Sequence, residues 1–196
     1  MQFYSTNKKS PLISLREAVL KGLAPDGGLF MPETIPRLPL DFFETLHTRA
    51  LPDMAFEVAK HFVGQDIPDQ DLRRIVEEAI NFDAPLIKLS GNIEVLELFH
   101  GPTLAFKDFG ARFMARLMSY LIETEEQDLI ILVATSGDTG SAVANGFYNV
   151  PHTRVVILYP SGKVSSLQEK QLTAMGGNVT ALEIQGVFDD CQRLAR

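Results

Sequence analysis

The second half of the chain alternates between two hydrophobic patterns. Three runs rich in apolar and β-branched residues have the length of strands: LIILVAT (129–135), RVVILYP (154–160) and NVTALEI (178–184). Between these runs, apolar residues recur at helical spacing. Apolar strands that are separated by helices favour a parallel sheet with helices on both faces. The pattern therefore predicts an α/β fold for this half.

The remaining elements of this half are predicted by the same criteria. A further strand candidate, IEVLELF, covers residues 93–99. Helices are expected at 108–123, 142–148 and 164–175, and from about residue 188 onward. The last helix stops at Arg196 without a helix-ending signal, so we expect a truncated α/β region that continues in a longer protein.

Residues 1–85 show a different sequence pattern, with many glycines and prolines and only short helical periods. The stretch GLAPDGGLFMPETIPRLPL (22–40) contains three glycines and four prolines, which predicts an irregular segment without a long helix or a central strand. Short helices are expected at 14–21, 41–46, 53–63 and 69–81. We therefore divide the chain into a helical, Pro/Gly-rich segment, 1–85, and the start of an α/β region, 86–196.

The charge, the cysteine and histidine content and the apolar runs argue against several classes of function. The formal net charge is −7 and the basic residues form no run, so the sequence does not predict nucleic-acid binding. Cys191 is the single cysteine and the four histidines fall in no metal-ligand spacing, so we expect neither a disulfide nor a metal site. The N-terminus lacks a signal-peptide core, and no apolar run has the length of a membrane span. We expect a soluble, cytoplasmic protein.

The stretch LFHGPTLAFKDFGARF (98–113) places Lys107 between Phe106 and Phe109, at the start of a predicted helix. The helix dipole and the apolar neighbours both disfavour the ammonium form there. A neutral amine is a nucleophile that can form a Schiff base with an aldehyde. The alternative is an ordinary surface lysine that packs along the aromatic rings or pairs with Asp108.

A second stretch, LIILVATSGDTGSAVANGFY (129–148), runs from an apolar strand through a polar loop into a helix. Free backbone amides and hydroxyls meet at such a helix start, which favours an anion or a carboxylate. The loop lacks the Gly-Lys-Ser/Thr of a Walker motif and the G-x-G of a dinucleotide fingerprint. Plain helix capping by Asp138 or Thr139 is the alternative.

Four motifs together resemble the threonine synthase family, in its longer bacterial and fungal branch. They are GLAPDGGLFMPE (22–33), LELFHGPTLAFKDFGARF (96–113), TSGDTGSAVA (135–144) and VVILYPSGKVSSLQEKQL (155–172). Members of this family are much longer than this chain, so the resemblance covers only their N-terminal portion.

The resemblance implies a pyridoxal 5'-phosphate enzyme of fold type II, the tryptophan-synthase-β kind. The implied reaction converts O-phospho-L-homoserine and water to L-threonine and phosphate. Lys107 matches the lysine that forms the internal aldimine with the cofactor and then shuttles protons. Asp138 falls where other members of the fold type carry an asparagine that faces the cofactor. The implied contacts to the substrate carboxylate come from Thr135, Ser136, Gly137 and Thr139.

The resemblance also limits what this chain should do. The family's glycine-rich cup for the cofactor phosphate and its partner for the pyridine nitrogen lie further along, so these 196 residues alone are expected to be inactive. The expected partner is a small amino-acid substrate, without nucleic acid or membrane, and the sequence does not predict an oligomeric state.

Two other functions stay open. The first is another enzyme of the same fold type, such as a dehydratase or a cysteine- or cystathionine-forming synthase, although these lack the DGGLFMPE leader. The second is a non-catalytic protein that keeps the fold as a binding module, against which the presence of Lys107 argues only mildly.

Overall fold

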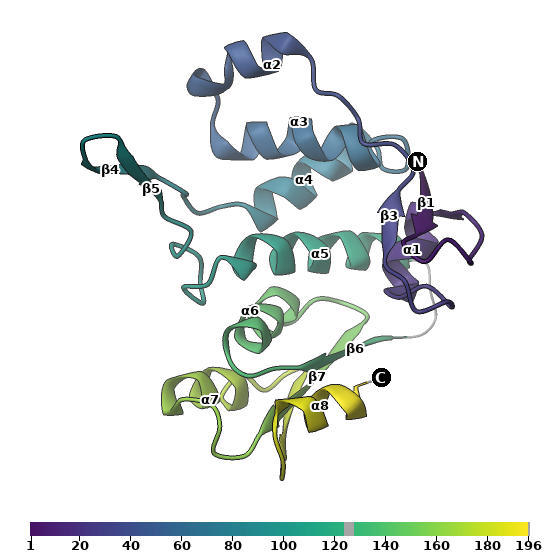
Figure 1. Ribbon diagram of the computed structural model, residues 1–196, viewed down its shortest axis with the longest axis vertical. Coiled ribbons are helices and arrows are strands. Elements are labelled where there is room, and N and C mark those ends of the chain that lie inside the picture. The colour runs from purple at the N-terminus through teal and green to yellow at the C-terminus, as the bar shows by residue number, and fades with distance from the viewer. Residues whose placement is uncertain (124–127, 196) are drawn as a thin grey trace. The chain divides into compact units, whose positions relative to one another are not determined.

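The computed structural model of the chain describes residues 1–123 and 128–195. These residues form two compact units, residues 1–77 and the described residues from 78 onward, which Figure 1 colours from purple to yellow along the chain. Within the described ranges, no helix combines the length and the apolar character that crossing a membrane requires.

The first unit contains a small antiparallel sheet that the sequence did not predict. Its strands are β1 (Gln2–Ser5), β2 (Ile13–Ser14) and β3 (Phe30–Pro32), in the order β2-β1-β3. The third strand lies within the Pro/Gly-rich stretch. It is three residues long and sits at the edge of the sheet, where a proline that lacks an N–H is tolerated.

The helices of this unit agree with the sequence to within two residues at each end. They are α1 (Leu15–Lys21), α2 (Leu40–Glu44), α3 (Leu51–Val63) and α4 (Asp69–Ala79), with a short 3-10 turn at Leu46–Thr48. The apolar residues that recur at helical spacing around α4 lie on its buried side: Leu72, Ile75, Val76 and Ala79 are all at most 4% exposed, and Ile80, just after the helix, is partly buried. The helical period of the sequence thus identified the core side of α4.

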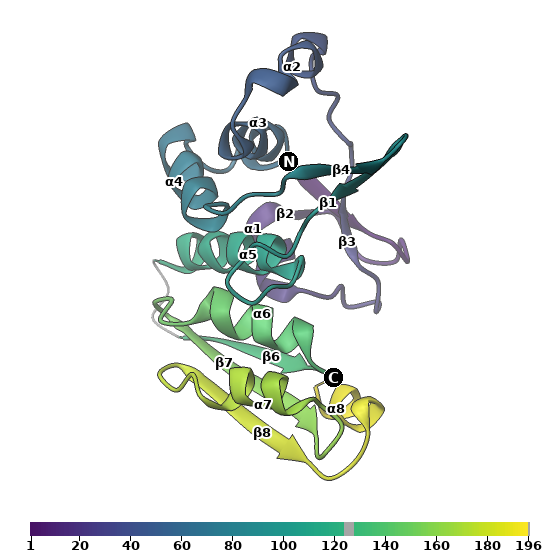
Figure 2. The same cartoon turned by 90° about the vertical axis from the view of Figure 1, so that its left-hand side faces the viewer.

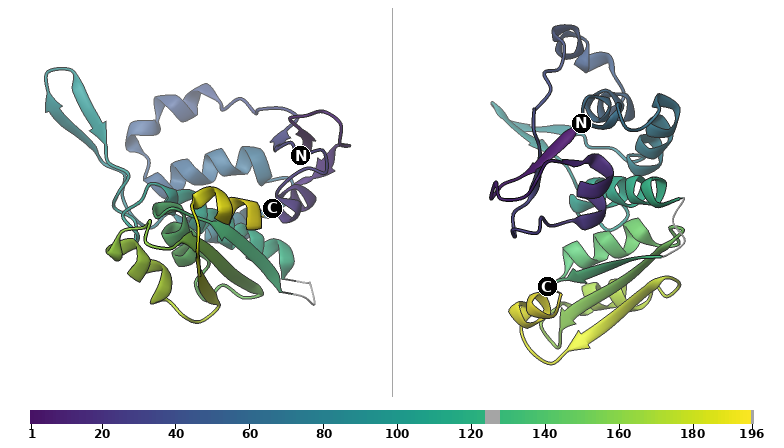
Figure 3. Two further views of the ribbon diagram at one scale, coloured as in Figure 1. Left: turned by 60° about the horizontal axis from the view of Figure 1, so that its bottom comes forward. Right: turned by 90° about the vertical axis from the view of Figure 1, so that its right-hand side faces the viewer.

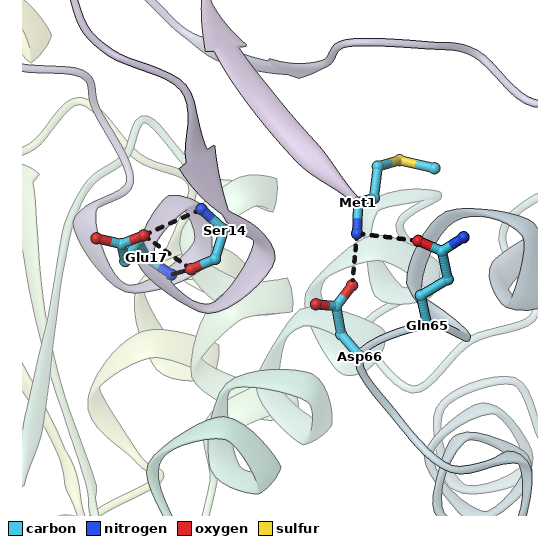
Figure 4. A network of polar contacts seen from close by, with 5 residues as sticks. All are labelled: Met1, Ser14, Glu17, Gln65 and Asp66. Atoms are coloured by element: carbon cyan, nitrogen blue, oxygen red, sulfur yellow. Dashed lines mark hydrogen bonds and ion pairs between the residues drawn. The ribbon is translucent and has the colours of Figure 1, made fainter.

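Two groups of hydrogen bonds fix the chain near its beginning (Figure 4). A capping box starts α1, because Ser14 Oγ accepts from the Glu17 N–H at 3.3 Å and the Glu17 carboxylate accepts from the Ser14 N–H at 3.0 Å. The amino group of Met1 donates to Asp66 Oδ2 at 3.1 Å and to Gln65 Oε1 at 3.4 Å.

Asp26 organises the irregular segment around the DGG sequence. Its carboxylate accepts hydrogen bonds from Ser5 Oγ at 2.6 Å, from the Lys9 N–H at 2.9 Å and from the Gly28 N–H at 3.0 Å. The bond from Ser5 is the main reason that the pKa of Asp26 falls to about 2. Because Ser5 is fully buried, this carboxylate ties the Pro/Gly-rich stretch to the end of β1.

We expect Gly28→Ala to lower the free energy of unfolding by about 1–3 kcal/mol, the usual range for overpacking. A Cβ at Gly28 would lie 2.2 Å from Ser5 Oγ and 2.9 Å from the Asn7 backbone nitrogen. Gly27→Asn is the matched control, because Gly27 has a φ of +77° that Asn tolerates and nothing lies within 4 Å of its Cβ position. Urea unfolding of both variants measures the difference, and equal midpoints would contradict the close approach.

The second unit contains the predicted parallel sheet. Its strands are β6 (Leu129–Ala134), β7 (Thr153–Pro160) and β8 (Val179–Ile184), in the order β6-β7-β8. Its helices are α5 (Lys107–Ile122), α6 (Asp138–Phe147), α7 (Ser166–Thr173) and α8 (Phe188–Leu194). Every strand pair in this sheet is parallel, and the α/β class is confirmed.

The core of this unit lies on one face of the sheet (Figure 2). Alternate residues of β7 point to it, and they pack in one cluster with apolar residues of α5, α6 and α7. The cluster includes Ala111, Ala115, Ala142, Ala144, Phe147, Val155, Ile157, Tyr159 and Leu172. The small alanines of α5 and α6 allow these two helices to approach closely. Helix α8 instead contacts β6 and β7, and its buried residue is Cys191.

The prediction for IEVLELF was only partly right. Strand β5 covers Ile93–Leu96, but it pairs antiparallel with β4 (Leu86–Ser90) in a two-stranded ribbon that is separate from the parallel sheet (Figure 3). All residues of both strands are exposed. The physical reason is the two-residue turn Gly91–Asn92, in which Gly91 has a φ of +55° and which closes a hairpin in place of a crossover.

Candidate active site

Two helices of the second unit begin at the same edge of the sheet. Helix α6 begins just after β6 ends, and α5, which precedes β6, also has its first turn at this edge (Figure 2). The two helices pack closely, since a Cβ at Gly146 of α6 would lie 3.0 Å from the Ala111 backbone of α5. Arg116 of α5 also donates to the Gly146 carbonyl at 2.9 Å. The first turns of two helices, with the positive ends of their dipoles, therefore lie at this edge.

Lys107 is the first residue of α5, one residue before the start that the sequence predicted for this helix. Its Nζ lies 4.5 Å from the centroid of the Phe106 ring, and its side chain is half-buried. The second aromatic neighbour, Phe109, packs on Phe82 with 4.5 Å between ring centroids. The amine thus rests on one aromatic face at a helix start.

The buried carboxylate of Asp108 fixes the turn in front of Lys107. It accepts hydrogen bonds from the Thr103 N–H at 2.8 Å and from Thr103 Oγ1 at 2.6 Å, and Asp108 is 0% exposed. Gly101 packs directly against the same carboxylate, because a Cβ there would lie 2.5 Å from Asp108 Oδ2. The Gly-Pro turn and the first turn of α5 are therefore one rigid junction. The contact to Thr103 is a role for Asp108 that the sequence interpretation did not include.

Thr135 shapes the polar loop between β6 and α6. Its side chain is buried, and Oγ1 accepts from the Gly137 N–H at 3.0 Å and from the Gly140 N–H at 2.8 Å. Gly137 has a φ of +150°, and a Cβ at Gly140 would lie 2.4 Å from Thr135 Cγ2. Both glycines are therefore required for the loop to close around the threonine hydroxyl.

The rest of the loop faces outward. Ser136, Asp138 and Thr139 are exposed, and Asp138 and Thr139 form the first turn of α6. Across residues 1–123 and 128–195, the backbone N–H groups of Asp138 and Thr139 have no hydrogen-bond partner. Ser136, Asp138 and Thr139 thus present donors suited to an anionic group, whereas the Thr135 hydroxyl and the Gly137 N–H bond to each other inside the loop.

Asp138 has a partner that the sequence interpretation missed. Its Oδ1 accepts a hydrogen bond from Gln168 Nε2 of α7 at 2.6 Å. The only local signal for Gln168 is the Ser-x-x-Gln spacing of a capping box, in which Ser165 is the N-cap of α7. Within the described part of the chain, no group of three or more His, Cys, Asp or Glu residues is placed to hold a metal ion.

Comparisons with known proteins agree on one family. A family model described as "Threonine synthase N terminus" matches residues 2–80. Threonine synthase from Serratia marcescens is 42% identical over 196 residues, which are 100% of this chain and 45% of that relative. Threonine synthase from Escherichia coli strain K12 is 41% identical over 196 residues, with the same two coverages. The chain thus spans less than half the length of the curated relatives it matches.

Solved structures give the same result. The crystal structure of a PLP-bound threonine synthase from Brucella melitensis matches with a TM-score of 0.91 and 40% identity, over 99% of this chain and 43% of that chain. Threonine synthase from Escherichia coli matches with a TM-score of 0.89 and 41% identity, over 99% and 45% of the two chains. Sequence and backbone therefore agree over nearly all of the present chain, which matches the N-terminal portion of threonine synthases.

Proposed function

We propose that the protein that carries this chain is a pyridoxal-phosphate enzyme that converts O-phospho-L-homoserine and water to L-threonine and phosphate. One observation carries the proposal. The first turn of α5, which contains Lys107, lies at the same sheet edge as the donor-rich first turn of α6. The PLP-bound relative from Brucella melitensis, which shares 40% sequence identity, supports the choice of cofactor.

The residues at this edge fit the cofactor chemically. Lys107 supplies a primary amine that can condense with an aldehyde, and its Nζ rests on the Phe106 ring. The first turn of α6 supplies free N–H groups for an anionic group, as argued above for Asp138 and Thr139. When bound, pyridoxal phosphate supplies an electron sink that stabilises negative charge on substrate carbons.

Lys107 has two roles in this proposal. It holds the cofactor covalently before substrate arrives, and its Nζ then carries protons between the carbons of the substrate. In the overall reaction, protons leave Cα and Cβ, the Cγ–O bond to phosphate breaks, a proton is placed at Cγ, water adds at Cβ, and a proton returns to Cα. The rigid junction around Asp108 keeps the amine in place for these transfers.

The loop between β6 and α6 binds the substrate carboxylate in this proposal. The N–H groups of Asp138 and Thr139 and the hydroxyls of Ser136 and Thr139 are the donors. Thr135 and Gly137 give the loop its shape, because the Thr135 hydroxyl is already bonded to the backbone. Asp138 would contact the cofactor in this proposal.

The test uses the full-length protein, incubated with O-phospho-L-homoserine with and without pyridoxal phosphate. We expect threonine and inorganic phosphate to form in equal amounts, and only when the cofactor is present. A protein that takes up the cofactor but consumes serine, threonine or an O-acylated serine instead would be another enzyme of the same fold type. A protein that takes up no cofactor would be a binding module, and either result would refute the proposal.

A further inference from the structure

We propose that Gln168 is a positioning residue of this site, which holds Asp138 and the bend at Gly137 in place from the neighbouring helix. The inference rests on the proposed function, and it concerns a side chain that lies 30 residues from Asp138 in the sequence. Gln168 joins the loop after β6 to the start of α7, which follows β7.

The hydrogen bonds of Gln168 fix which end of its amide faces Asp138. Its Oε1 accepts from Ser165 Oγ at 3.0 Å and from the Ser165 N–H at 3.4 Å, so the oxygen points to the N-cap of α7. The nitrogen then faces Asp138 Oδ1 at 2.6 Å, and an ionised carboxylate can only accept. Both ends of the amide are therefore engaged, and a flipped amide would break both contacts.

Gln168 also supports the loop by direct packing. A Cβ at Gly137 would lie 2.5 Å from Gln168 Nε2 and 2.7 Å from its Cδ. The amide thus lies flat against the one residue of the loop whose φ of +150° requires glycine. Gln168 contacts the loop at its bend and at the first residue of α6, which are the two points that set where the free N–H groups point.

The variant Gln168→Glu tests this role, because it keeps the shape of the side chain and replaces the donor by an acceptor. At about pH 8, two carboxylates would face each other, and we expect kcat/KM for O-phospho-L-homoserine to fall by roughly 10²-fold, as for a misplaced site. At about pH 5.5, the two carboxylates can share a proton, so most of this loss is expected to disappear.

Gln171→Glu is the matched control. It makes the same charge change on the same helix, but among the described residues Gln171 forms no side-chain hydrogen bond to the loop, whereas Gln168 donates to Asp138. We expect its pH profile to match that of the parent. The same comparison in the cofactor-free protein uses the melting temperature: only Gln168→Glu is expected to lose stability as the pH rises from about 5.5 to 8.

The outcomes separate this inference from the proposed function. If the parent shows no cofactor-dependent phosphate release, the proposed function fails, and the melting curves of the cofactor-free protein still test the Gln168–Asp138 contact. If the parent is active and Gln168→Glu behaves like Gln171→Glu at every pH, the inference is wrong. Should Gln168→Glu not fold, Gln168→Ala removes the donor without adding charge. It is expected to lower kcat/KM with no recovery at low pH, and unchanged kcat/KM would again overturn the role.

Discussion

Replacing Lys107 by Ala in the full-length protein is expected to lower the rate of phosphate release by at least about 10²–10⁴-fold, the usual loss for a general acid–base group. The variant loses both the covalent hold on the cofactor and the proton carrier at Nζ. Because Lys107 lies half-buried at the start of α5, the shorter side chain leaves the helix intact. The loss should therefore be in chemistry, with an unchanged melting temperature.

Two measurements check the assignment. Borohydride reduction of the cofactor-loaded parent, followed by peptide mass spectrometry, is expected to place the adduct on the peptide that contains Lys107. Lys170→Ala is the control, since Lys170 is an exposed lysine of α7, and this variant should keep both the adduct and the activity. An adduct on another lysine, or turnover that survives in Lys107→Ala, would show that a different amine holds the cofactor.

The parallel sheet could be predicted because its signal is local and strong. The runs that became β6, β7 and β8 are apolar or β-branched, as strands covered by helices must be, and each strand lies within one residue of the predicted run. Helix ends were less accurate: α6 begins at Asp138 instead of residue 142. The polar first turn of α6, DTGS, contains no apolar period, so pattern alone placed it in the loop.

The ribbon of β4 and β5 shows how the same reasoning failed. Apolar residues on both faces of β5 imitate a strand that helices cover, although Ile93 and Leu96 are 59% and 54% exposed. The Gly91–Asn92 pair was the available signal for a hairpin, since glycine with a positive φ is typical of two-residue turns. Turn chemistry, and not hydrophobic pattern, decided the pairing here.

The candidate site also contains residues that the sequence could identify and residues that it could not. Lys107 and the loop at 135–139 could be identified because a helix start creates its chemistry from consecutive residues. Gln168 could not, because its contact with Asp138 depends on how α7 packs beside α6. Thr103 lies only five residues from Asp108, but this contact was also not predicted. The carboxylate is buried inside the turn because Gly101 packs directly against it.

Asp108→Ala is expected to reduce both stability and activity while Lys107 is still present. The change leaves the N–H and hydroxyl of Thr103 without their acceptor, and hydrogen bonds to a charged group contribute about 1.5–3 kcal/mol each. We expect the free energy of unfolding to fall by about 3–6 kcal/mol, the sum for the two bonds. Once the turn is free, the start of α5 shifts, and kcat should fall by roughly 10²-fold.

Asp108→Asn and Asp189→Ala complete this experiment. The asparagine keeps the volume and one accepting oxygen, so its unfolding free energy should lie between those of the parent and of Asp108→Ala. Asp189 also lies in the first turn of a helix, α8, but it is exposed, and its replacement should cost less than about 1 kcal/mol. Chemical denaturation gives the stabilities, and borohydride trapping reports whether Lys107 still reaches the cofactor. If Asp108→Ala and Asp189→Ala are equally stable and equally active, the buried carboxylate does not hold the turn that places the lysine.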